Sequence, residues 1–241
     1  MSKGIHVLGA SGTGTTTLGK ALVEYYAYPH FDIDDYFWLP SDPPFQHVRS
    51  RPARQALLAG DLARQRCWVL SGSLCGWGDL FIPLFAVVMF LWVPPTVRLA
   101  RLAERERSRY GAATLVPDGG MHRQHTAFMA WAAAYDDGDL TMRSRRLHEQ
   151  WLQSLRCPVL RLEGEQPVEE SLTQVVQYVS THPLHAEVVG GSWEGTRRSL
   201  TQPQSRTGAI GPGSGGHSEE GGQDEGFSQG QAEQGFAGDR Q

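Results

Sequence analysis

One glycine-rich stretch near the start of the chain constrains the fold more than any other. The apolar residues Ile5, Val7 and Leu8 lead into the sequence GASGTGTT, and a segment with helical character follows. Apolar residues in this density suit a buried parallel strand, and glycines allow a turn whose backbone N–H groups point inward. The sequence therefore predicts a strand, a tight turn and a helix from about Thr15 to Tyr26.

The turn matches the phosphate-binding loop G-x-x-x-x-G-K-[ST] at every defined position except one. Gly9 and Gly14 hold the glycine positions and Thr16 the hydroxyl position, but Thr15 replaces the lysine. We predict that this loop binds ATP or another nucleoside triphosphate, and that the Thr16 hydroxyl binds the accompanying Mg²⁺. The alternative is a turn that is merely rich in small residues. The predicted nucleotide contacts are Gly9, Ala10, Ser11, Gly12, Thr13, Gly14, Thr15, Thr16 and Thr17.

The second predicted strand begins at His30, runs towards Trp38 and ends in acidic and aromatic residues. Ligands of open parallel sheets bind outside the carboxyl ends of the strands, so these acids would lie near the loop. We expect Asp32 to hold Mg²⁺ and Asp34 to orient or deprotonate an acceptor hydroxyl as a catalytic residue. The alternative is a solvated acidic turn in which an aspartate caps a helix.

The positive charge that the loop lacks would have to come from arginine. The only lysines are Lys3 and Lys20, so nearly all of the 22 basic residues are arginines. The helix after Pro95 carries four of them at spacings that share one face, and further ones follow a glycine-containing loop. A salt-bridged, solvated helix is the alternative. The predicted phosphate clamp consists of the catalytic candidates Arg105 and Arg109 and the substrate-binding candidates Arg143 and Arg145.

The third predicted strand, from Cys67 to Gly72, ends without the carboxylate that often orients Mg²⁺ in proteins with a phosphate-binding loop. Small Ser71 and Gly72 leave room for a ligand, and Trp77 can stack on a base or sugar. Arg54, on the helix before this strand, is a candidate residue for binding the anionic group of the acceptor. The alternatives are a core position for Trp77 and a solvated helix face for Arg54.

Composition narrows the class of partner. The chain has 241 residues, 40% of them hydrophobic, and a formal net charge of −4, so neither nucleic acid nor an anionic membrane is expected to attract it. Three cysteines without metal-like spacing favour a reduced, cytoplasmic protein, and no signal peptide is expected. We expect a small-molecule acceptor as the partner, while composition gives no indication of oligomeric state.

Two regions follow from the chain as a whole. Residues 1–182 are expected to form one α/β domain, a three-layer sandwich around five parallel strands, with a short lid over residues 110–121. Residues 183–241 are rich in glycine, serine, glutamine and glutamate and poor in large apolar residues. Such a segment cannot bury enough surface to fold, so a disordered tail is predicted.

Four segments, GASGTGTTTLGKAL, HFDIDDYFWLP, WVLSGSLCGWGD and RLAERERSRYG, resemble the adenylate-kinase-like group of P-loop small-molecule kinases. The resemblance covers roughly residues 4–180 and is strongest to the bacterial subgroup of adenylate kinase and related, topology-modulation-like kinases, whose members are similar in carrying threonine at the lysine position. It implies a sheet of order 2-3-1-4-5, ATP on the loop, the acceptor near Asp34 and a lid with arginines. The third strand lacks the DGFPR signature, so adenylate kinase activity itself is not expected.

Two function classes remain open from the sequence. One is a phosphotransferase that moves the γ-phosphoryl group of MgATP to a small hydroxyl or phosphate acceptor. The other is a non-catalytic or weakly hydrolytic nucleotide-binding module with a regulatory role. A donor carrying sulfate or another anion is a third possibility that a phosphate-binding loop alone does not separate from the first.

Overall fold

The structure is a computed structural model that describes residues 3–181, and the predicted tail lies outside these residues. Five strands form one sheet in the order β2-β3-β1-β4-β5, and every neighbouring pair is parallel. The strands are β1 (Lys3–Gly9), β2 (His30–Asp32), β3 (Cys67–Ser71), β4 (Phe85–Trp92) and β5 (Val159–Glu163). The predicted α/β class and strand order are therefore confirmed.

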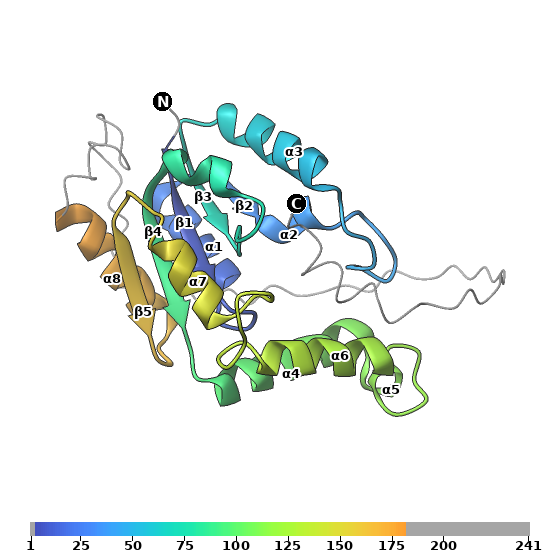
Figure 1. Cartoon of the computed structure of the whole chain (residues 1–241). Coiled ribbons are helices and arrows are strands. Elements are labelled where there is room, and N and C mark those ends of the chain that lie inside the picture. Colours follow the sequence, from blue (N-terminus) through green and yellow to red (C-terminus); the bar gives the residue numbers. More distant parts are fainter. Residues whose placement is uncertain (1–2, 182–241) are drawn as a thin grey trace, which may run out of the picture.

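Helices cover both faces of this sheet (Figure 1). They are α1 (Thr15–Tyr26), α2 (Ile33–Phe37), α3 (Arg51–Ala63), the 3₁₀ helix η1 (Asp79–Leu84), α4 (Pro95–Tyr110), α5 (Ala112–Leu115), α6 (His122–Ala133), α7 (Arg145–Leu152) and α8 (Val168–Thr181). Within residues 3–181, no helix has both the length and the apolar character needed to cross a membrane.

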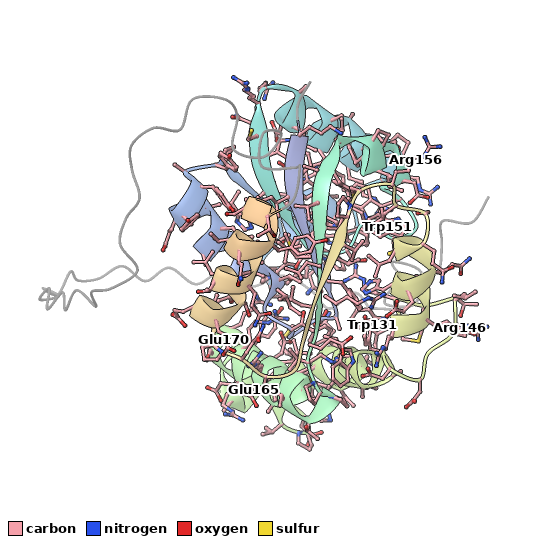
Figure 2. The ribbon with its side chains drawn as sticks, turned by 90° about the vertical axis from the view of Figure 1, so that its left-hand side faces the viewer. Trp131, Arg146, Trp151, Arg156, Glu165 and Glu170 are labelled. Carbon is pink, nitrogen blue, oxygen red and sulfur yellow. The ribbon has the colours of Figure 1, made fainter. Side chains whose placement is uncertain are left out.

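Two apolar clusters make the sandwich three layers deep. The first joins one face of the sheet to α1 and α8, with Leu18, Leu22 and Val175 among its buried members. The second joins the opposite face to α2, α3 and α7, and includes Leu58 and Trp151. Figure 2 shows α8 and α7 on opposite sides of the sheet. Burial of apolar strands on both faces is the expected outcome of continuous apolar runs such as β4.

The second strand is shorter than the sequence predicts, and this difference matters for the site. β2 ends at Asp32, where the carboxylate oxygen Oδ1 accepts a 3.1 Å hydrogen bond from the backbone N–H of Asp34. Asp32 is thus the N-cap of α2, and Ile33 and Phe37 turn inward on that short helix. Asp34 therefore lies in the first turn of a helix instead of on a strand.

The carboxyl ends of the strands share one edge of the sheet, and α4, α5 and α6 lie beyond that edge in Figure 1. The predicted lid segment contains the four-residue helix α5, so it is only partly a loop. The helical region after it is divided in two: α6 ends at Ala133, and α7 begins behind Ser144, whose Oγ accepts a hydrogen bond from the N–H of Leu147. These elements bring Arg105 and Arg143 within electrostatic reach of Asp34.

Candidate functional site

The glycine-rich loop joins β1 to α1 in the manner that the motif requires. Thr13 closes the turn: its backbone N–H and its hydroxyl both donate to the carbonyl of Ala10, at 3.2 and 2.8 Å. α1 begins at Thr15 behind Gly14, and no side chain among the described residues caps its first turn. The first-turn N–H groups and the positive end of the helix dipole are therefore available to an anion.

The loop packs against the start of α4 at Gly12. This residue has a φ of +84°, and a Cβ atom placed on it would lie 2.7 Å from the carbonyl oxygen of Arg98. Only glycine meets both demands without strain. The contact fixes the arginine-bearing helix α4 beside the loop.

Thr16 and Asp32 form a direct pair at the carboxyl edge of the sheet. The Thr16 hydroxyl donates to Oδ2 of Asp32 at 2.7 Å, and the Ser71 hydroxyl donates to the same oxygen at 3.3 Å. Hydroxyl and carboxylate oxygens are the ligands that Mg²⁺ prefers, so this pair fits the ion that accompanies a nucleotide. Among the described residues, no group of three or more His, Cys, Asp or Glu side chains is placed to hold a metal ion. The phosphates would have to supply the remaining ligands.

Asp34 interacts electrostatically with two arginines from distant parts of the chain. Its side chain is open to solvent, yet surrounding protein atoms desolvate the carboxyl group; together with the charge of Asp32 this raises the pKa of Asp34. Arg143 and Arg105 act in the opposite direction. Desolvation likewise lowers the pKa of both arginines, which remain cationic at neutral pH. A carboxylate and two guanidinium groups thus share one accessible, partly desolvated place.

Arg143 lies beside a buried polar network that the sequence gave no reason to expect. His148 on α7 is fully buried, with Nδ1 2.9 Å from the Tyr135 hydroxyl and Nε2 3.0 Å from the Ser73 hydroxyl. Burial lowers the pKa of His148 to about 3, and the positive charge of Arg143 acts in the same direction. The guanidinium of Arg143 also lies 5.6 Å from the centroid of the Trp131 ring. No short motif marks this set, because its members come from three separate segments.

The arginines of α4 do not act as one clamp, although their spacing places them along one side of the helix. Arg98 is fully buried, and its Nη2 atom lies 2.6 Å from Oδ2 of Asp136. Arg101 pairs with Glu165 at 3.4 Å. Of the α4 arginines, Arg105 is the one that acts electrostatically on Asp34, so the single basic face that the spacing predicted is divided among different partners.

Arg109 and Arg145 lie against aromatic rings. The guanidinium of Arg109 is 4.7 Å from the centroid of Phe45 and also pairs with Glu106 at 3.5 Å. The guanidinium of Arg145 is 5.0 Å from the centroid of Trp92. Neither is among the charges that act on Asp34, which separates them from Arg105 and Arg143.

The candidates around the third strand are more buried than expected. Ser71 is fully buried at the end of β3 and contacts Asp32, while the N–H of Gly72 donates to the Val7 carbonyl at 2.9 Å. Trp77 is 4% exposed and belongs to the core cluster, so the structure corrects its expected stacking on a ligand. Arg54 is also 4% exposed, with its guanidinium 4.5 and 4.9 Å from the ring centroids of Phe37 and Trp77. It is therefore not on a solvated helix face.

No family model matches the chain. It is 44% identical over 182 residues to "Uncharacterized protein YqaC" of Bacillus subtilis (strain 168). The matched region covers 76% of this chain and 100% of that protein. Similar solved structures include shikimate kinase from Acinetobacter baumannii in complex with shikimate, with 15% identity and a TM-score of 0.44 over 75% of this chain and 94% of that chain. A gluconokinase from Sinorhizobium meliloti 1021 has 17% identity and a TM-score of 0.41, over 75% and 98%.

Proposed function

The chain belongs to the same family as the uncharacterized protein YqaC of Bacillus subtilis, and we propose that it transfers the γ-phosphoryl group of MgATP to a small hydroxyl or phosphate acceptor. The observation that carries this proposal is the grouping of Asp34 with Arg105 and Arg143, near the Asp32–Thr16 pair. A carboxylate and cationic groups near a phosphate-binding loop are the parts that phosphoryl transfer needs.

The loop from Gly9 to Thr16 would bind the phosphates through backbone N–H groups and the positive end of α1. Thr16 and Asp32 would hold Mg²⁺, which when bound neutralises charge on the phosphate oxygens. Both residues already lie at hydrogen-bond distance from each other. The two side chains proposed to hold Mg²⁺ are therefore neighbours in the structure.

Arg105 would supply the positive charge that the loop lacks because Thr15 stands at the lysine position. The first turn of α4 lies beside the loop, where the Arg98 carbonyl meets Gly12. Arg105 lies about two helical turns further along the same helix. Arg105 is exposed and interacts with Asp34, so its guanidinium lies on the acceptor side of the site. An arginine that stabilises transition-state charge can raise kcat by about 10³ to 10⁵.

Asp34 would bind the acceptor hydroxyl and accept its proton. Its raised pKa makes it a stronger base than an ordinary surface aspartate, and it remains open to solvent and therefore to a ligand. Arg143 would hold an anionic group of the acceptor or the transferred phosphoryl group, because a guanidinium binds such oxygens in a planar, bidentate manner.

The experiment is a phosphate-transfer assay with MgATP across nucleosides, nucleotides and polyols. Acceptor-dependent ADP release is expected for at least one compound, with kcat reduced by about 10²-fold or more in Asp34→Ala and Arg105→Ala. Ser180→Ala, an exposed position on α8, serves as the matched control. Tight ATP binding without transfer to any acceptor would remove the kinase proposal.

Thr15 is the specific observation that favours a second candidate, a nucleotide-binding regulatory module. The loop N–H groups and the Thr16–Asp32 pair are sufficient for binding a nucleotide, whereas rapid transfer also needs positive charge at the γ-phosphate. This candidate is supported by saturable ATP or GTP binding in a protein that gives no acceptor-dependent turnover.

A further inference from the structure

A chain of hydrogen bonds runs across the carboxyl edge of the sheet from His30 to Thr16. Nε2 of His30 lies 2.9 Å from the Ser71 hydroxyl, which in turn donates to Oδ2 of Asp32 at 3.3 Å. The same Oδ2 accepts the 2.7 Å hydrogen bond from Thr16. The chain connects β2, β3 and the first turn of α1, and the phosphate-binding motif itself demands neither His30 nor Ser71.

The packing of α1 makes room for the imidazole. Gly19 is buried in the interior of α1, where glycine is less favourable than alanine. A Cβ atom on Gly19 would lie 2.7 Å from Nε2 of His30 and 3.3 Å from Cβ of Ser71. The helix that follows the loop therefore lacks a side chain at the place where His30 meets Ser71.

The positions of the protons give this series of hydrogen bonds a direction from donor to acceptor. A serine hydroxyl has one proton, and Ser71 gives it to the Asp32 carboxylate, the stronger acceptor. The Ser71 oxygen then accepts from His30, so the imidazole carries its proton on Nε2. Oδ1 of Asp32 is meanwhile held by the N–H of Asp34. Both carboxylate oxygens are thus fixed before any ligand binds.

We propose that His30 is a positioning residue which, through Ser71, orients the Asp32 carboxylate towards the Mg²⁺ of the bound nucleotide. The inference rests on the proposed function, because the ion arrives with the nucleotide. Groups that hydrogen-bond to metal ligands and orient them change metal affinity or activity by about 10- to 100-fold when removed. Among residues 3–181, the hydrogen bond of the His30 side chain goes to Ser71 and not to the acceptor-side arginines or the loop backbone, so its effect should be confined to the Mg²⁺-dependent part of binding.

Calorimetric titration of the full chain with ATP and with GTP, in excess Mg²⁺ and in EDTA, tests this role. His30→Phe and Ser71→Ala should each weaken binding in Mg²⁺ about 10-fold, with less than about a twofold change in EDTA. The double variant should bind the nucleotide no more weakly than the weaker-binding single variant, because both changes interrupt the same series of hydrogen bonds. His30→Gln, which keeps an N–H donor, should recover part of the loss, and Ser180→Ala should change nothing.

Equal weakening with and without Mg²⁺, or additive losses in the double variant, would show a merely structural role and overturn the inference. A ligand-free measurement separates this failure from failure of the proposed function. Long-range ¹H–¹⁵N NMR of the free protein should show His30 as the Nε2–H tautomer, and the Nδ1–H tautomer overturns the inference even where nucleotide binds. A wild-type chain that binds neither ATP nor GTP contradicts the proposed function, and the Mg²⁺-positioning role with it.

Discussion

Nη2 of Arg98 lies 2.6 Å from Oδ2 of Asp136 and ties the start of α4 to the turn that follows α6. Arg98 is fully buried, and the indole N–H of Trp92 donates to the other oxygen of the same carboxylate at 2.9 Å. The backbone of Arg98 also abuts the phosphate-binding loop at Gly12. This ion pair therefore connects the loop to the segment that carries Arg143.

Asp136→Ala is expected to lower the free energy of unfolding by about 3 kcal/mol, because it leaves the buried Arg98 guanidinium without its counter-charge. Urea denaturation at pH 7 measures the loss. The neighbouring exposed residue offers the control Asp137→Ala, which should stay within about 0.5 kcal/mol of wild type. Equal effects of the two changes would contradict the structural role of the pair.

Asp34→Asn is expected to stabilise the fold at neutral pH while it removes the proposed base. Desolvation of the carboxyl group by surrounding protein atoms and the charge of Asp32 raise the pKa of Asp34, so the folded state holds this proton more tightly than the unfolded state. Ionisation therefore opposes folding above that pKa, and a neutral amide avoids the cost. The gain in Tm should be largest near pH 7 and shrink as the pH falls towards 4. Asp118→Asn, in the exposed turn after α5, is the control, and a lower Tm for Asp34→Asn at pH 7 would contradict the argument.

Two buried histidines should make the fold acid-sensitive. Burial lowers the pKa of His6 to about 4 and that of His148 to about 3, so both are neutral in the folded protein and take up protons on unfolding. Their stabilising effect is complete above the unfolded pKa of about 6.5 and declines as the pH falls. Between pH 7.5 and 5, each of the two histidines should lower the free energy of unfolding by about 2 kcal/mol.

His6→Leu separates the two contributions. Nε2 of His6 is buried without a hydrogen-bond partner among residues 3–181, and Nδ1 lies 3.1 Å from the Leu70 carbonyl oxygen, so a leucine fills a similar space at the cost of that one hydrogen bond. The variant should lose about half of the decline in stability between pH 7.5 and 5 in urea titrations. The exposed His47→Gln serves as control, and an unchanged pH dependence in His6→Leu would count against burial of a neutral imidazole.

Thr15→Lys should distinguish the two candidate functions. In either case the new ammonium should tighten ATP binding, because it adds a cation at the start of α1, where the phosphates of a bound nucleotide are proposed to lie. If the wild type transfers phosphate with Arg105 in place of the lysine, the Arg105→Ala loss should become smaller in the Thr15→Lys background. Tighter binding without acceptor-dependent turnover in any variant would favour the regulatory module.

The local part of the site could be predicted because its signals are local. The glycine spacing fixed the loop, and the helix predicted from about Thr15 to Tyr26 has those bounds in the structure. The second strand was predicted too long, since its end is set by a hydrogen bond from the N–H of Asp34 to its neighbour Asp32. That bond begins a helix within an apolar segment that pattern alone does not distinguish from a strand.

The sequence by itself determined the class of fold, the position of the loop and the pair of acids after the second strand, because glycine spacing and apolar runs act over a few residues. Only the tertiary structure decided which arginines act electrostatically on Asp34. Arg98 and Arg101 pair with Asp136 and Glu165, which come from segments 38 and 64 residues away, whereas Arg105 and Arg143 act electrostatically on Asp34. Helical spacing places side chains on a face, but their charges are assigned by partners that the fold brings together.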